Sequence, residues 1–285
     1  SGFDSIGIAL QLYNTICAEE IDSGLKIEIL DDTSKFLPHD GRNLVYRAMQ
    51  RVFDEVGYKC KGIRIVQNNK IPVTRGLGSS SASIVGGLMA ANKISGEHLD
   101  KDTLITLAAQ IEGHPDNTTP AITGGMSVAV LREKVHHIDV RVNGNHLAFA
   151  LYIPDFTLRT KKARSVLPRT IPHSDAVFNT GRAALLSAAM LTEQYEFLRI
   201  ALQDRLHQPY RKKLIKGVNA LFDQSYELGC YGTYISGAGP TIISIVNAAE
   251  KDVFENNMSD FLKEQMPNWN LMMLKPDNLG ARIIT

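Results

Sequence analysis

The chain has 285 residues, of which 44% are hydrophobic and 21% charged, and its formal net charge is +1. At ~150 residues per domain, this length suits one large domain or two ordinary ones with a normal apolar core. The near-neutral net charge gives no electrostatic signature of binding to nucleic acid or to an anionic membrane, so we expect neither partner. Apolar runs fall far short of the ~20 residues of a membrane span, and the 3 scattered cysteines fit buried thiols in a reducing cytoplasm.

The first half of the chain alternates between strand and helix patterns. Short apolar or alternating runs predict strands at residues 2–10, 25–30, 61–66, 124–131, 135–142 and 147–153. Apolar residues at helical spacing predict a helix over residues 43–56 that Gly57 ends. A second predicted helix runs from an Asp102 cap to about Glu112. The Asn143-Gly144 pair predicts a hairpin turn between the last two strands.

The second half has a different pattern. We expect helices at residues 174–205, 212–228 and 251–265, and strands at residues 231–236, 241–246 and 271–274. With residues 147–153 as the opening strand, the order is β, helices, β, β, α, β, which is that of a ferredoxin-like α/β sandwich. The polar stretch 154–172 is the expected junction, and the predicted domains are residues 1–150 and 151–285.

A glycine- and serine-rich loop, PVTRGLGSSSAS at residues 72–83, leads directly into an apolar helix. Backbone amides at a helix N-terminus lack partners and attract anions, and glycines let a phosphate approach the backbone closely. The loop has neither the Walker ending nor the spacing of a dinucleotide fingerprint. By itself it fits either a phosphate-binding loop or a plain helix start.

Two further loops favour the phosphate hypothesis. EGHPDNTTPAITGG, at residues 112–125, gathers polar side chains after a helix, and its Glu112 suits Mg²⁺, which prefers carboxylate oxygens. ISGAGPTIIS, at residues 235–244, is a second glycine-rich turn between strands and can bring backbone amides close to a ligand.

These loops resemble the motifs of one kinase superfamily. P-x-x-x-G-L-G-S-S-S-A at residues 72–82 resembles the ATP-binding motif of the GHMP kinases. S-G-A-G-P-T at residues 236–241 resembles their third motif, and G-F-D-S-I-G at residues 2–7 resembles the latter part of the first. Within the superfamily, four motifs together resemble the homoserine kinase family. They are G-F-D, H-P-D-N-x-x-P-A-I-x-G-G at residues 114–125, T-K-x-A-R-x-x-L-P at residues 160–168 and P-Y-R at residues 209–211.

The resemblance implies an α/β (α+β) two-domain GHMP kinase fold. Its N-terminal domain would be similar to the second domain of ribosomal protein S5, and its C-terminal domain would be ferredoxin-like. The implied activity is transfer of the ATP γ-phosphoryl group to the side-chain hydroxyl of L-homoserine, a step of threonine biosynthesis, with Mg²⁺ as cofactor and a homodimer as the assembly. Two alternatives stay open: another GHMP kinase, of the mevalonate or sugar type, and a non-catalytic regulatory protein with this fold.

The resemblance also implies roles for individual residues. The ATP-binding residues would be Pro72, Val73, Thr74, Arg75, Gly76, Leu77, Gly78, Ser79, Ser80, Ser81 and Ala82, with Asn43 near the nucleotide base. The ligands of Mg²⁺ would be Glu112 and Ser80. The homoserine site would comprise Asp4, His114, Asn117, Arg164 and Arg211, with Gly237 and Gly239. Thr160, Lys161 and Asn117 would lie at the transferring phosphate.

The residue types suit a free amino acid as substrate. Asp4 and Asn117 can bind an ammonium group, and Arg164 and Arg211 can bind a carboxylate in a bidentate manner. From the residues alone, Asp116 would be the general base. The resemblance instead makes Asp116 structural and places Asn117 where other GHMP kinases have an aspartate. Since an amide cannot act as a base, the hydroxyl proton would leave late, to a phosphate oxygen.

Overall fold

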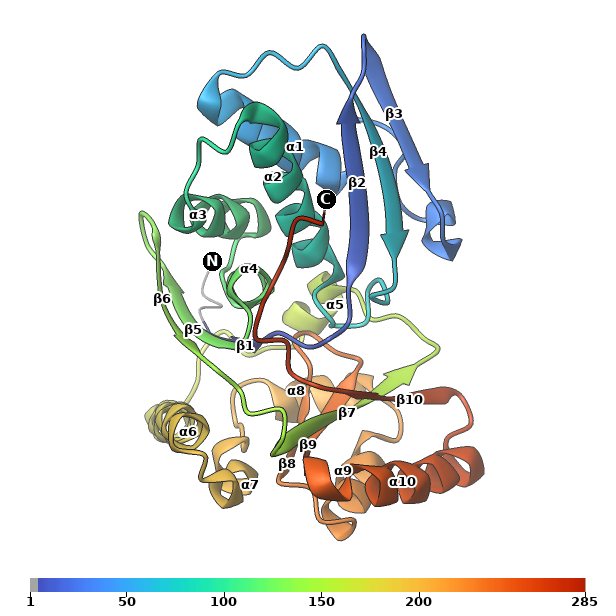
Figure 1. Ribbon diagram of the computed structural model, residues 1–285. Coiled ribbons are helices and arrows are strands. Elements are labelled where there is room, and N and C mark those ends of the chain that lie inside the picture. The colour runs from blue at the N-terminus through green and yellow to red at the C-terminus, as the bar shows by residue number, and fades with distance from the viewer. Residues whose placement is uncertain (1–4, 285) are drawn as a thin grey trace. The chain divides into compact units, whose positions relative to one another are not determined.

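The computed structural model describes residues 5–284, which form two compact units (Figure 1). Unit 1 contains the chain up to Val73, residues 78–141 and the segment from Asp277 onwards. Unit 2 contains residues 74–77 and 142–276. These two compact units have other boundaries than the predicted domains, residues 1–150 and 151–285. The predicted domain boundaries stay a prediction.

Unit 1 has two three-stranded sheets among its described residues. One has the order β2-β4-β3, from β2 (Asn14–Glu20), β4 (Gly62–Asn69) and β3 (Gly24–Ile29); β2 is antiparallel and β3 parallel to β4. The other is antiparallel with the order β1-β5-β6, from β1 (Ser5–Ile8), β5 (Met126–Leu131) and β6 (Val135–Val140). The helices are α1 (Leu44–Val56), α2 (Ser79–Ser95), α3 (Lys101–Glu112) and α4 (Thr118–Thr123).

The core of unit 1 forms where α1 and α2 cover one face of the β2-β4-β3 sheet (Figure 1). On α1 the buried residues Val45, Ala48, Met49, Val52 and Phe53 recur at helical spacing, so one apolar stripe faces the sheet. The C-terminal segment completes this unit: the Ala281 N–H donates to Ala121 O, and the Asp277 N–H donates to Ala9 O.

Unit 2 is built on one antiparallel sheet with the order β10-β7-β9-β8. Its strands are β7 (Leu147–Pro154), β8 (Gly232–Ile235), β9 (Ile242–Asn247) and β10 (Trp269–Leu274). Its helices are α5 (Thr160–Ser165), α6 (His173–Thr192), α7 (Leu198–Ala201), α8 (Gln208–Arg211), α9 (Val218–Glu227) and α10 (Lys251–Gln265). The predicted ferredoxin-like order is therefore confirmed.

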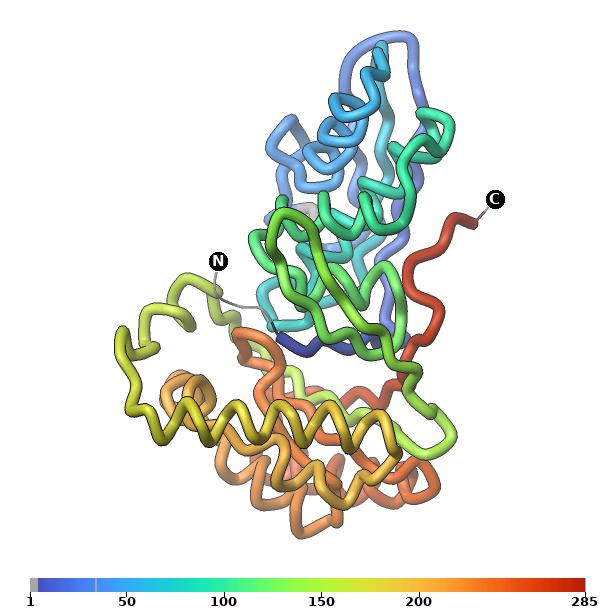
Figure 2. Tube along the Cα trace, turned by 90° about the vertical axis from the view of Figure 1, so that its left-hand side faces the viewer, coloured from blue at the N-terminus to red at the C-terminus, as the bar shows by residue number. Residues whose placement is uncertain are grey.

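Several predicted features differ in the structure. Asn143-Gly144 is not a hairpin turn, because β6 pairs with β5 while β7 pairs with β9 and β10 in another sheet. The predicted helix 174–205 is broken at Glu193, which has a φ of 56° and ends α6; Figure 2 shows α6 as a separate long helix. The predicted helix 212–228 starts late, because Gly217, at φ 80°, lies before α9.

The cap of α3 was predicted two residues too late. The Asp100 side chain accepts the Thr103 N–H at 2.8 Å, and Asp102 lies in the first turn. The elements β2, α4 and α5 carry too weak a pattern to have been predicted. Within the described residues, no helix is long and apolar enough to cross a membrane.

Candidate active site

Helix α2 begins without a side-chain cap. Gly78 precedes its first residue, has a φ of 73° and offers no capping oxygen, and the first turn carries no acidic residue. The amides of Ser79 and Ser80 thus sit at the positive end of the helix dipole. The Ser81 hydroxyl is buried and has no hydrogen-bond partner among the described residues. Such a helix start is suited to bind an anion.

The residues just before α2 belong to unit 2 and are bonded there. The Ser236 hydroxyl donates to Gly76 O at 2.7 Å, and the Thr241 N–H donates to Arg75 O at 3.2 Å. A Cβ atom at Gly76 would lie 2.4 Å from Ser236 O, and its φ of 77° disfavours side chains. Only glycine fits where this loop meets the β8–β9 turn.

Arg75 anchors the same loop. Its guanidinium donates to Pro154 O at 2.9 Å and to Asp155 O at 2.6 Å, both at the end of β7. Burial lowers the pKa of Arg75, although the Asp155 carboxylate opposes this effect. These bonds fix the loop, and a direct contact between Arg75 and a nucleotide stays a prediction.

The structure brings the two predicted magnesium ligands together. The Ser80 hydroxyl on α2 donates to Glu112 Oε1 at the end of α3, at 2.6 Å. A hydroxyl and a carboxylate form an oxygen donor set that fits Mg²⁺. The described residues contain no cluster of three or more His, Cys, Asp or Glu side chains that could hold a metal.

The loop of residues 114–117 is held tightly within unit 1. The His114 imidazole hydrogen-bonds the Asp116 carboxylate, which also accepts the Asn117 N–H at 3.0 Å. A Cβ atom at Gly7 would lie 1.7 Å from Asp116 O, so strand β1 can approach this loop only with a glycine. A Cβ atom at Gly78 would lie 3.8 Å from Asn117 Oδ1, which places this side chain beside the start of α2.

In unit 2, Arg211 lies against the second glycine-rich turn. Its side chain is 8% exposed, and Nη1 donates to Gly237 O at 2.7 Å. Gly239 packs closely, since a Cβ atom there would lie 3.1 Å from Ile235. On α5, Arg164 is half-buried near its end, while Thr160 and Lys161 are exposed at its start.

Two other predicted residues have different outcomes. Asn43 is buried and caps α1: its Oδ1 accepts the Val45 N–H and the Gln67 side-chain amide, each at 2.9 Å, and its Nδ2 donates to Pro38 O. This role gives its predicted contact with the nucleotide base no support. Asp4, with the rest of G-F-D, lies outside the described residues.

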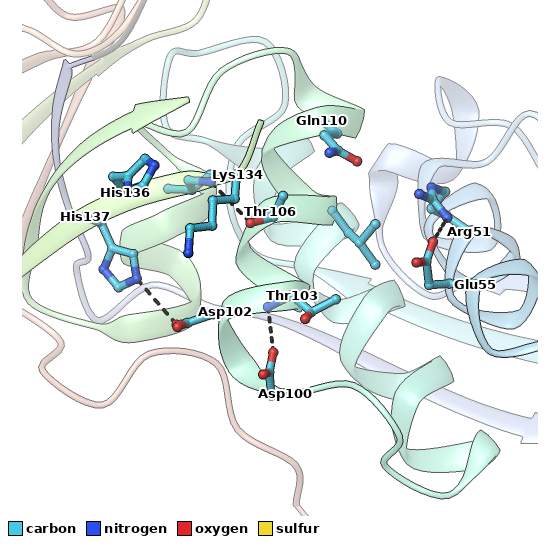
Figure 3. Close-up of a pocket in the computed structure, with 12 residues that line it drawn as sticks. Arg51, Glu55, Asp100, Asp102, Thr103, Thr106, Gln110, Lys134, His136 and His137 are labelled. Atoms are coloured by element: carbon cyan, nitrogen blue, oxygen red, sulfur yellow. Dashed lines mark hydrogen bonds and ion pairs between the residues drawn. The ribbon is translucent and has the colours of Figure 1, made fainter. Parts of the chain in front are cut away.

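A separate cavity of about 630 Å³ lies in unit 1, lined by α1, α3 and β6. Figure 3 shows its ion pairs: Arg51 faces Glu55 at 2.5 Å, and His137 faces Asp102 at 3.7 Å. None of the predicted site residues lines this cavity.

Comparison with known proteins decides the family. The family model of the GHMP kinases N terminal domain matches residues 43–125, and that of the GHMP kinases C terminal domain matches residues 181–264. This chain belongs to the GHMP kinase family. The uncapped start of helix α2 lies in the ATP-binding motif of residues 72–82, and the Ser236–Gly76 hydrogen bond joins this motif to the third motif of residues 236–241.

Several relatives that match this GHMP kinase over nearly their whole length are named homoserine kinase. A homoserine kinase from Caldicellulosiruptor bescii is 49% identical over 100% of this chain and 93% of its own length. One from Clostridium botulinum is 45% identical over 99% of this chain and 94% of its own length. The crystal structure of a homoserine kinase from Cytophaga hutchinsonii matches with a TM-score of 0.87 at 27% identity, covering 99% of this chain and 92% of that one.

More distant structures show the fold of this GHMP kinase alone. A mevalonate kinase from Methanococcus jannaschii matches with a TM-score of 0.71 at 16% identity, covering 95% of this chain and 90% of that one. The predicted two-domain GHMP kinase fold is thereby confirmed.

Sequence reasoning did not single out Ser236 or the anchoring role of Arg75. A serine directly before a glycine-rich turn is the available signal for Ser236, but it does not reveal a partner 160 positions away in the chain. Arg75 is predicted among the ATP-binding residues because it lies in the ATP-binding motif, and an arginine in a glycine-rich loop carries no local signal of backbone anchoring.

We predict that Gly76→Ala destabilises the GHMP kinase more than Gly57→Ala does. Both glycines have positive φ, at 77° and 66°, but a Cβ atom at Gly57 meets nothing within 4 Å. Left-handed strain alone costs about 1–2 kcal/mol, and a backbone clash adds about 1–3 kcal/mol. Thermal unfolding of the two variants measures the difference. Equal unfolding midpoints would show that the loop moves away freely.

Proposed function

We propose that this GHMP kinase transfers the γ-phosphoryl group of ATP to the side-chain hydroxyl of L-homoserine. The observation that carries the proposal is the set of full-length relatives named homoserine kinase, at 42–49% identity. The local geometry supports it, since an uncapped helix start, an oxygen donor pair and a buried arginine occur at the matching motifs.

We assign the phosphates to the start of α2. Phosphoryl transfer depends mainly on positioning and on stabilising charge, with little covalent work by the protein. The amides of residues 78–81 offer donors at the positive helix end, and the Ser81 hydroxyl is a buried donor with no partner among the described residues. Residues 74–77, which come directly before these donors in the chain, are fixed within unit 2 by the Ser236 hydroxyl and the Arg75 guanidinium.

We assign Mg²⁺ to Glu112 and Ser80. Their oxygens already meet at 2.6 Å, and phosphate oxygens and water would complete the shell. Bound there, Mg²⁺ would supply positive charge beside the phosphate oxygens.

We assign the homoserine carboxylate to Arg211 and Arg164, and its ammonium to Asn117, His114 and Asp4. A buried guanidinium such as that of Arg211 favours a carboxylate partner, because it must replace lost hydration with charge-assisted hydrogen bonds. Thr160 and Lys161, exposed at the start of α5, would contact the transferring group.

We propose that no side chain acts as general base. Asn117 cannot accept a proton, and the Asp116 carboxylate is engaged by His114 and by the Asn117 N–H. Those bonds support a structural role for Asp116, which holds the loop that carries Asn117. The hydroxyl proton would then pass to a phosphate oxygen.

We also propose a cytoplasmic location, and a homodimer formed through α6. This helix carries a stripe of exposed small and apolar residues with the 4-3-4-3 spacing of a coiled-coil seam. The stripe consists of Val177, Gly181, Ala184, Ala188 and Leu191. Val177 and Leu191 are each 58% exposed. Two copies of such a stripe fit an isologous contact.

The dimer proposal predicts that Ala184→Glu separates the copies, because it places a charge in the middle of the stripe. Light scattering after gel filtration measures the mass; we expect two chains for the wild type and one for the variant. A single-chain mass for the wild type at micromolar concentration would contradict the dimer.

The function predicts ADP release that depends on ATP, Mg²⁺ and L-homoserine together. Arg211→Ala and Arg164→Ala should each raise KM for homoserine by roughly 10- to 100-fold, since each removes a hydrogen-bonded charge. The matched control is Arg169→Ala, at an exposed position, which should change KM for homoserine little.

Mevalonate and galactose are offered in parallel as alternative substrates. Turnover of either in place of homoserine would retain the family and reject the substrate, and silence with all three despite ATP binding would favour a regulatory protein.

The magnesium assignment predicts a changed metal requirement in Glu112→Gln. Losing the carboxylate charge should raise the Mg²⁺ concentration for half-maximal activity by roughly tenfold or more. Glu133→Gln makes the same chemical change at an exposed position of unit 1 and should leave the Mg²⁺ curve unmoved. An unshifted curve in Glu112→Gln would remove this residue from the metal site.

A further inference from the structure

The short helix α8 has to orient the buried guanidinium of Arg211, although it has only four residues, Gln208–Arg211. A helix of one turn has almost no stability of its own. The residues around α8 must therefore fix its position.

Asp204 gathers the backbone at the start of α8. Its Oδ1 accepts the Leu206 N–H at 2.8 Å, and its Oδ2 accepts the N–H groups of His207, at 2.8 Å, and Gln208. Its Oδ1 also accepts the Asn179 side-chain amide from α6, at 2.6 Å. Burial alone would raise the pKa of Asp204, but these hydrogen bonds outweigh burial and leave that pKa lowered.

Two further contacts tie this segment to its surroundings. Gln208 Oε1 accepts the Ile235 N–H at the end of β8, at 3.0 Å, and its Nε2 donates to Leu202 O at 3.1 Å. On the α6 side, the Phe178 ring is stacked between two guanidinium groups. The Cζ atoms of Arg182 and Arg205 lie 3.5 and 3.9 Å from the ring centroid. The segment between α7 and α8 is thus fixed on one side to α6 and on the other to β8.

We infer that Asp204 is a positioning residue for substrate recognition: it acts through α8 to hold the Arg211 guanidinium in the orientation that binds the carboxylate of the substrate. This inference rests on the proposed function of Arg211. Asp204 itself touches no substrate, and its two oxygens serve four donors.

The variant Asp204→Asn tests this geometry sharply. An amide has one oxygen where the carboxylate has two, so an NH₂ group would face either two backbone N–H donors or one backbone donor and the Asn179 amide. The matched control is Asp260→Asn on α10 of the same unit, where an exposed carboxylate pairs with Lys263 at 3.1 Å.

In steady-state kinetics we expect kcat/KM for L-homoserine to fall about 10- to 100-fold in Asp204→Asn, as for the loss of one or two hydrogen bonds to a charged group. The loss should appear in KM for homoserine, while KM for ATP and the Asp260→Asn control stay within about twofold. In an Arg211→Ala background, Asp204→Asn should add no more than about twofold, because its effect passes through Arg211. An unchanged kcat/KM, equal effects on both substrates, or multiplied effects in the double variant would overturn the inference.

A second measurement does not depend on the reaction. Hydrogen exchange of residues 203–212, in the absence of substrate, should be faster in Asp204→Asn, and faster to a smaller extent in Asn179→Ala. If Asp204→Asn fails to fold, Asn179→Ala takes its place in the kinetics as well. If the wild type releases no ADP with homoserine, the proposed function is rejected, and exchange alone then decides whether Asp204 fixes α8. Unchanged exchange would overturn its positioning role.

Discussion

The loop before α2 must satisfy two different surroundings within a few residues. Residues 74–77 are bonded into unit 2, whereas Gly78 and the helix that follows belong to unit 1. Gly76 can accept the Ser236 hydroxyl only because it has no Cβ atom, and Gly78 can turn into α2 because its φ is positive. The amides at the start of α2 have no capping side chain to compete with an anion.

The end of β8 in unit 2 forms hydrogen bonds with three other segments. Among three consecutive residues, the Ile235 N–H donates to Gln208, the Ser236 hydroxyl donates to Gly76 O, and Gly237 O accepts from Arg211. The loop of residues 74–77, proposed to bind ATP, and the arginine proposed for the substrate carboxylate thus share one support. A shift at the end of β8 would disturb both together, which explains why a glycine-rich turn at this point is packed so closely.

The sequence predicted what depends on local pattern. The amphipathic stripe of α1, helix α10 and the order of elements in unit 2 follow from periodicity, and the motifs led to the family. It missed elements with a weak local pattern: β2 has only Ile16 and Ala18 as apolar residues on its half-buried side, and α4 carries Pro120 in its interior. Nothing in the sequence around Glu193 marks the left-handed residue that ends α6. The bond between Asn43 and Gln67 and the partners of Arg75 could not be predicted either, because they join distant segments of the chain.

The return of the C-terminal segment to unit 1 has a consequence for how this chain folds during synthesis. Asp277 and Ala281 bond to Ala9 and Ala121, residues that leave the ribosome long before them. Unit 1 therefore stays incomplete until residues 277–281 emerge, after the described strands of unit 2, of which β10 is the last. Such closure over a long stretch of chain is entropically slow, so the early unit must wait with part of its apolar surface uncovered.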